Sequence, residues 1–222
     1  ADSESVKENA VLAGLFPDSC YSFESGGHPA HIPDLTYEQF VDGHRRFYHP
    51  SNSYIILDGD LDIEKVTAHI DSNYLCRYES IEPCPMPEMQ KPVKSEMNEV
   101  YFEQSKDMPL ENRSSLELGF VIGKFDEKEK IYAARILSDI LCDNNQSYLT
   151  SSLLSKGLAE DVSIHIIDGI LQPCGVIDIK NIKDGSASQV RKTVMELLSE
   201  LCKKGIDRSE LEAAVSNFEF QL

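Results

Sequence analysis

The sequence has no run that approaches the roughly 18 apolar residues needed to cross a bilayer. Its first residues, Ala1-Asp2-Ser3-Glu4, carry neither the basic nor the apolar stretch of a secretory signal. Clusters of lysine or arginine are also missing, so the positive surface that binds a phosphate backbone is not expected. These features argue against a membrane partner and against a nucleic acid partner.

Cysteine pairs of the CxxC kind are lacking as well. The six cysteines stand far apart, at positions 20, 76, 84, 142, 174 and 202. Disulfide frameworks are typical of shorter secreted chains, and zinc ribbons need paired cysteines. The pattern therefore predicts reduced, mostly buried thiols and a reducing compartment.

Neither of the helical zinc motifs HExxH and HxxEH occurs. Four histidines come close together in the sequence: His28, His31, His44 and His49. Pro29 and Pro33 interrupt any helix around the first two, and no glutamate takes the position of a general base. We expect no metal at these four residues. His44 is predicted on the buried face of a helix, and His49 at a helix terminus.

The chain does have length, apolar content and acidity. With 222 residues, of which 41% are hydrophobic, it predicts a globular protein of one large domain, or of one domain and a part. The formal net charge is −17, from 38 acidic and 21 basic residues. Such acidity attracts cationic partners, and the alternative is that it only maintains solubility.

Periodicity and capping signals predict mixed helices and strands. Thr36 and Gln39 are spaced as a capping box before an amphipathic helix that Pro50 ends, and Asp62 caps a second helix. Further helices are predicted over 1–15 and from 126, 147, 186 and 207, with strands over 53–57, 99–103, 115–122, 162–167 and 175–182. The last two strands resemble a hairpin. We expect an α+β fold whose sheet is covered mainly on one face.

A proline-rich segment divides the chain. Prolines at 83, 85, 87 and 92 exclude both a helix and a central strand, so residues 81–95 are predicted to be an extended linker. It separates residues 1–80 from residues 96–222. Both ends of the chain fall within apparent helices, and we therefore expect a fragment of a larger protein.

An ordered series of short stretches runs through nearly the whole chain. It includes LFPD at 15–18, SGG at 25–27, LT at 35–36, YHPSN at 48–52, SKGL at 155–158 and LQP at 171–173. The series resembles the presequence-protease subgroup of the inverted-motif zinc peptidases, the pitrilysin and insulysin family. SGGxP followed by the LT capping helix and YHPSN makes a chance agreement improbable.

The resemblance implies metalloprotease-like repeated units, each an antiparallel sheet covered by helices, in a peptidase whose two halves enclose a chamber. Residues 1–80 would be the C-terminal half of a first, catalytic-type unit, and 96–222 a second, non-catalytic unit truncated at its C-terminus. In such peptidases zinc is held by the two histidines of HxxEH and a later glutamate, with the glutamate of the motif as general base. This chain has no such motif, and we expect that segment upstream of Ala1. Zinc is therefore expected in the parent protein and not in this chain.

The function implied is that of a fragment of a zinc metalloendopeptidase that degrades short unfolded peptides. This piece would supply scaffold and chamber wall, be inactive alone, and pair with the missing halves of the same chain. A catalytically silent structural or binding subunit of the same fold is the alternative. The implied compartment is cytoplasmic, as for a bacterial homologue, or else the mitochondrial or another organellar matrix.

One loop is a candidate for contact with peptide in the chamber. Ser25, Gly26 and Gly27 form a glycine-rich turn, and glycine lets backbone approach a bound peptide closely. A purely structural turn is the alternative. Arginine-rich targeting peptides would suit an acidic chamber, so basic peptides are a candidate substrate class.

Overall fold

The computed structural model describes residues 3–221 except 104, 108 and 110. These residues group into two compact units. Unit 1 consists of the described residues of 1–24 and 88–222, and unit 2 consists of residues 25–87. The chain thus returns at residue 88 to the unit in which it begins.

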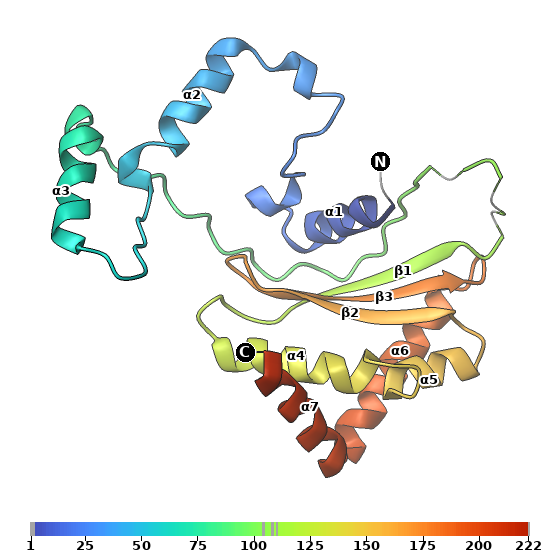
Figure 1. The fold of residues 1–222 in the computed structure, drawn as a ribbon. Coiled ribbons are helices and arrows are strands. Elements are labelled where there is room, and N and C mark those ends of the chain that lie inside the picture. Colours follow the sequence, from blue (N-terminus) through green and yellow to red (C-terminus); the bar gives the residue numbers. More distant parts are fainter. Residues whose placement is uncertain (1–2, 104, 108, 110, 222) are drawn as a thin grey trace. The chain divides into compact units, whose positions relative to one another are not determined.

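Unit 1 is built on an antiparallel sheet (Figure 1). Its three strands among the described residues are β1 (Ser114–Val121), β2 (Asp161–Ile167) and β3 (Cys174–Ile182). Their order is β1-β3-β2, so that β3 lies in the centre. Val162 pairs with Ile179 and Ile164 with Ile177, which confirms the predicted hairpin.

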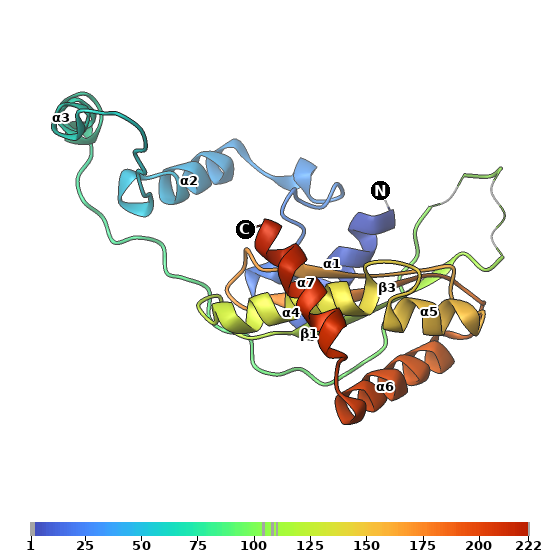
Figure 2. The same cartoon turned by 60° about the horizontal axis from the view of Figure 1, so that its bottom comes forward.

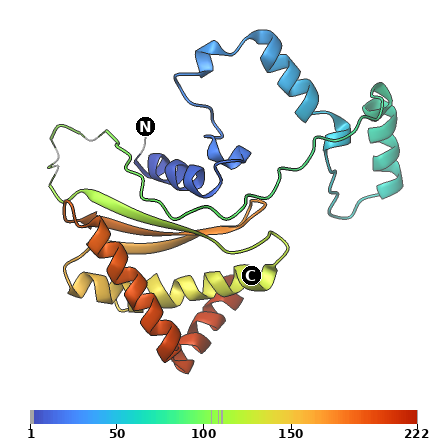
Figure 3. The same ribbon diagram turned by 180° about the vertical axis from the view of Figure 1, so that it is seen from behind.

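Helices cover both faces of this sheet unequally (Figures 1 and 3). On one face lie α4 (Lys128–Cys142), α5 (Tyr148–Ser155) and α6 (Ala187–Lys204), and α7 (Arg208–Gln221) packs on α4 (Figure 2). On the other face lies α1 (Ser3–Leu15), which packs on β1. The predicted α+β class, with a sheet covered mainly on one face, is confirmed.

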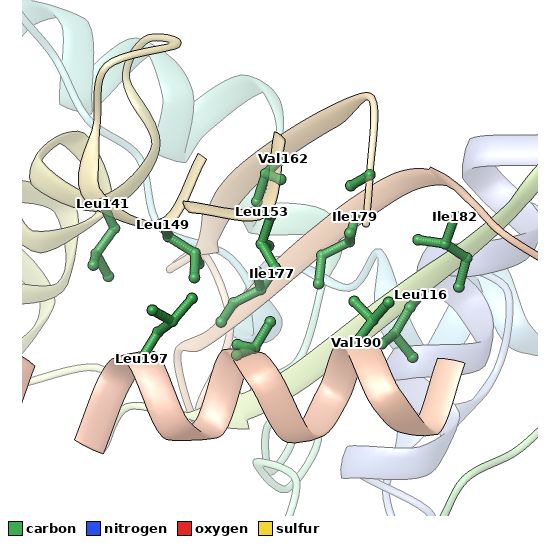
Figure 4. Close-up of a cluster of buried hydrophobic side chains, with 12 residues drawn as sticks. Leu116, Leu141, Leu149, Leu153, Val162, Ile177, Ile179, Ile182, Val190 and Leu197 are labelled. Atoms are coloured by element: carbon green, nitrogen blue, oxygen red, sulfur yellow. The ribbon is translucent and has the colours of Figure 1, made fainter. Parts of the chain in front are cut away.

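The hydrophobic core lies between the sheet and the helices α4, α5 and α6. Every second residue of a strand points to this face, because side chains alternate along a strand. Figure 4 shows Ile177 and Leu116 of the sheet facing Val190 and Leu197 of α6. Burying a side chain of this kind contributes about 1.5–3 kcal/mol. This packing forms the hydrophobic core of unit 1.

Unit 2 consists of short helices and irregular segments. Its main helices are α2 (Tyr37–Phe47) and α3 (Ile63–Asn73). The predicted capping box is present, since the Gln39 amide donates to Thr36 Oγ1 at 3.2 Å and the Thr36 amide donates to Gln39 Oε1 at 2.9 Å. The Asp62 cap of α3 is present too. Short 3₁₀ turns complete unit 2: Ile32–Asp34, Pro50–Asn52 and Leu75–Arg77.

Two predicted strands are wrong. Residues 53–57 and 99–103 have no regular secondary structure. Both segments are rich in β-formers, but a strand also needs a neighbour to pair with, and neither has one among the described residues. Tyr54 and Ile56 are left 98% and 90% exposed.

Two burial predictions also need correction. His44 lies on α2 but is exposed, because no residue of α2 is buried. All six cysteines are free, yet only Cys174 is buried, while Cys20, Cys76 and Cys202 are exposed. The expectation of mostly buried thiols is therefore wrong. His49 does lie at a helix terminus, where its Nδ1 accepts from the Ser51 amide at 3.1 Å.

The proline-rich segment is anchored at Gln90. The amide of Gln90 donates to Gln172 Oε1 at 2.6 Å, and Gln172 Nε2 donates back to the Gln90 carbonyl at 3.1 Å. The Gln90 side chain also bonds to Asp18. The described residues of 78–113 contain no helix or strand. In the described part of the chain no helix is long and apolar enough to span a membrane.

Candidate functional site

One group of potential metal ligands stands out within the described part of the chain. Glu4, Glu117 and Asp178 each place a carboxylate oxygen within 4.8 Å of the others. Glu4 comes from α1, Glu117 from β1 and Asp178 from β3. None of the histidines belongs to this group.

The ammonium group of Lys7 lies in the middle of these carboxylates. Its Nζ is 3.1 Å from Glu4 Oε2, 3.1 Å from Asp178 Oδ2 and 3.4 Å from Glu117 Oε1. The Lys7 residue is only 8% exposed. A second cation, Lys180, lies 3.3 Å from Glu4 and 3.5 Å from Asp178. We call these five residues the clasp.

The clasp does not fit the zinc that the family resemblance implies. Zinc sites in proteins are built mainly from histidine and cysteine, whereas the clasp offers carboxylates alone. The position between those carboxylates is already taken by the ammonium of Lys7. Its chemistry is that of an internal ion-pair network that fastens α1 to the sheet.

Local structure explains how the clasp assembles. Glu4 and Lys7 are three residues apart on α1 and therefore share one helix face. Glu117 and Asp178 are direct partners in the β1–β3 register, on the sheet face opposite the hydrophobic core. Further along β1, a Cβ on Gly119 would lie 2.6 Å from Cγ1 of Val11. Gly119 therefore lets α1 approach the sheet closely.

The carboxyl groups of the clasp are not equivalent. Burial raises the pKa of Glu117, and the charge of Asp178 raises it further against the opposing effect of Lys7. For Glu4, burial acts in the same direction, but the hydrogen bonds to Lys7 and Lys180 prevail and lower its pKa. Burial disfavours the charged form of Lys7, yet its bond to Glu4 and the charge of Asp178 keep its pKa raised.

The clasp was not predicted from the sequence, although one signal was available. Asp178 and Lys180 are the charged residues of a mostly apolar central strand, and Asp178 is 1% exposed. A charge at the centre of a buried strand needs an opposite charge nearby. The sequence does not reveal that this partner is Lys7, which lies 171 residues away on α1.

The predicted chamber loop lies at the start of unit 2. Ser25, Gly26 and Gly27 are all exposed, and a Cβ on Gly26 would meet nothing within 4 Å. Gly27 has φ +82°, in the left-handed region that favours glycine. The backbone conformation of the turn is therefore enough to explain a glycine at position 27. Contact of this loop with a peptide stays a prediction.

Comparison with known proteins agrees with the sequence resemblance. The chain is 34% identical over 222 residues to Protein HypA of Clostridium perfringens, which covers 99% of this chain and 23% of that protein. It is 30% identical over 221 residues to presequence protease 1, chloroplastic/mitochondrial, of Arabidopsis thaliana, covering 94% of this chain and 20% of that protein. The chain therefore spans less than a quarter of the length of these relatives.

The fold agrees as well. A crystal structure of a peptidase M16 inactive domain from Pseudomonas fluorescens matches 96% of this chain and 50% of that one, with a TM-score of 0.72 and 20% identity. The family model described as the peptidase M16 inactive domain matches residues 34–218. The chain belongs to the M16 peptidase family.

Proposed function

We propose that this chain is a non-catalytic part of a zinc metalloendopeptidase that degrades short unfolded peptides in an enclosed chamber. The chain supplies scaffold and chamber wall, and the zinc and its general base belong to other parts of the parent protein. Three facts support the proposal: the match to an inactive domain of a peptidase family, the presequence-protease relatives, and the lack of HExxH and HxxEH in this sequence.

The observation that carries the proposal is the exposed apolar surface of unit 2. No residue of 25–87 is buried. On α2 and just after it, Tyr37, Phe40, Phe47 and Tyr48 are between 54% and 78% exposed. Phe40, Phe47 and Tyr48 follow Tyr37 by three, ten and eleven residues, which places all four on one face of the helix.

Such a face is typical of a surface that another part of a protein covers. Unit 2 alone buries too little apolar surface to offset the conformational entropy lost on folding. The proposed cover is the remainder of the parent peptidase, since the relatives are more than four times as long as this chain. The alternative partner is another polypeptide, which applies if the parent is a catalytically silent subunit of the same fold.

The substrates proposed are unfolded peptides, with basic ones favoured. The chain carries a net charge of −17, and an acidic wall attracts cationic peptides and repels anionic ones. In this proposal the Ser25-Gly26-Gly27 loop faces the peptide. The compartment proposed is the bacterial cytoplasm or an organellar matrix.

Peptide hydrolysis tests the proposal. The 222-residue chain, and the same chain extended to its full-length parent protein, would be incubated with a fluorogenic basic peptide and with an acidic control peptide. We expect no cleavage by the chain alone and cleavage by the extended protein that a zinc chelator abolishes. Chelator-sensitive cleavage by the chain alone would contradict the proposal. An extended protein that binds peptides without cleaving them would support the silent-subunit alternative instead.

A further inference from the structure

Two buried carboxylate oxygens of the clasp have no hydrogen-bond partner in the described structure: Glu117 Oε2 and Asp178 Oδ1. Buried polar atoms without a partner are uncommon in folded proteins and call for an explanation. The other oxygen of each group, Glu117 Oε1 and Asp178 Oδ2, faces the ammonium of Lys7. The unpaired oxygens therefore belong to two carboxyl groups that share one cation.

The register brings these two carboxyl groups together. Glu117 and Asp178 are directly opposite each other on β1 and β3, so their side chains stand on the same face of the sheet. Two like charges in this arrangement repel each other. The Asp178 side chain is 2% exposed and the Glu117 side chain 11% exposed, so water screens this repulsion little.

The charge count of the clasp also favours a bound proton. Glu4, Glu117 and Asp178 contribute three carboxyl groups, and Lys7 and Lys180 contribute two ammonium groups. One bound proton would make the clasp neutral. A proton shared by Glu117 and Asp178 would also remove the repulsion between two like charges directly opposite each other.

We propose that Glu117 and Asp178 share one proton while α1 is packed on the sheet, so that the attachment of α1 is linked to pH. The proton comes from solvent and is held between the two carboxyl groups. When α1 leaves the sheet, both side chains become hydrated and the proton returns to solvent. No other bond is made or broken.

The groups that face Glu117 determine whether the attachment of α1 strengthens or weakens as pH falls. They are Glu4 and Lys7 from α1 and Asp178 from β3, while Lys180 of β3 lies beside Glu4 and Asp178. From β2, Ser163 lies opposite Asp178 and the exposed His165 opposite Val176. Burial and the charge of Asp178 raise the pKa of Glu117 above its ordinary value of 4.5, so the packed form binds the proton more tightly than the open form does. Attachment of α1 therefore strengthens as pH falls towards that ordinary value.

A carboxyl titration by ¹³C NMR tests the proposal on the full 222-residue chain uniformly labelled with ¹³C and ¹⁵N. The Glu117 signal is assigned in the wild-type chain through its own backbone, so that the test does not depend on a variant that folds. We expect Glu117 to titrate at a higher pH than the exposed glutamates, and the Asp178→Asn variant to lower its midpoint. A Glu117 midpoint in the range of the exposed glutamates or below it would overturn the proposal.

Two variants provide the matched comparison. Glu117→Gln keeps the shape of the side chain and removes its titratable carboxyl group. The unfolding temperature of this variant, measured between pH 5 and pH 8, should lack the part of the pH dependence that Glu117 contributes in the wild type. Glu129→Gln removes a charge from an exposed position on α4 and should keep the wild-type dependence. Identical pH dependence in the wild type and in Glu117→Gln would also overturn the proposal.

Discussion

Lys7 Nζ lies 3.1 Å from Asp178 Oδ2, although 171 residues separate the two in the sequence. This ion pair joins the helix at the start of the chain to the central strand of the sheet. While α1 stays packed on this face of the sheet, Asp178 is 1% exposed and cannot reach water when its partner is lost. Loss of Lys7 should therefore both loosen α1 from the sheet and lower the stability of unit 1.

The first prediction concerns that lysine. Lys7→Met retains most of the aliphatic stem but leaves Asp178 and Glu117 without their main cation. Removing one member of a buried ion pair costs about 3–5 kcal/mol, and we expect a loss of this size in the free energy of unfolding measured with urea.

Lys192→Met is the matched control, since Lys192 is exposed and pairs with Glu196 on the surface of α6. Surface substitutions of this kind usually change the free energy of unfolding by less than about 0.5 kcal/mol. Equal losses for the two variants would refute a structural role for the clasp.

The second prediction concerns the close approach of α1 to β1. An added Cβ at Gly119 would lie 2.6 Å from Val11 Cγ1 and 3.0 Å from Leu15 Cδ1. We expect Gly119→Ala to lower the free energy of unfolding by about 1–3 kcal/mol, as overpacking usually does. The change should also speed amide hydrogen exchange in α1.

Gly169→Ala serves as its control, because nothing lies within 4 Å of a Cβ at that position. If Gly119→Ala is as stable as Gly169→Ala, α1 is not held against β1 in solution.

The third prediction concerns thiol reactivity. Burial raises the pKa of Cys174 to about 11, with the charge of Glu8 adding to the effect, and burial also raises the pKa of Cys142 to about 11. The thiolate is the reactive form, so these two cysteines should resist iodoacetamide at pH 8. The exposed cysteines at 20, 76 and 202 should be labelled first. Mass spectrometry of partly labelled protein gives the order, and early labelling of Cys174 would show that the sheet opens under native conditions.

Structural features that depend on a few neighbouring residues could be predicted from the sequence. The capping box of Thr36 and Gln39 lies within four consecutive residues, and the β2–β3 hairpin follows from alternation on both sides of a short connection. Both could be predicted without knowledge of the rest of the fold. The family resemblance was likewise carried by short stretches in order.

Long-range features could not be predicted in this way. The segments 53–57 and 99–103 have the composition of strands, but pairing decides whether a strand forms, and composition does not specify a partner. The clasp depends on α1, β1 and β3 meeting, so the roles of Lys7 and Glu117 become visible only in the assembled unit. The amphipathic pattern of its helix predicts His44 on a buried face, yet His44 is exposed in this chain.

The most direct test of the proposal that the catalytic chemistry belongs to other parts of the parent protein is the zinc content of this chain. The 222-residue protein would be stripped of metal, dialysed against a slight excess of zinc and then against buffer. Elemental mass spectrometry would then give the number of zinc ions bound per chain. We predict far less than one zinc ion per chain, because the sequence has neither helical zinc motif and Lys7 fills the carboxylate cluster. One firmly bound zinc ion per chain would contradict that proposal.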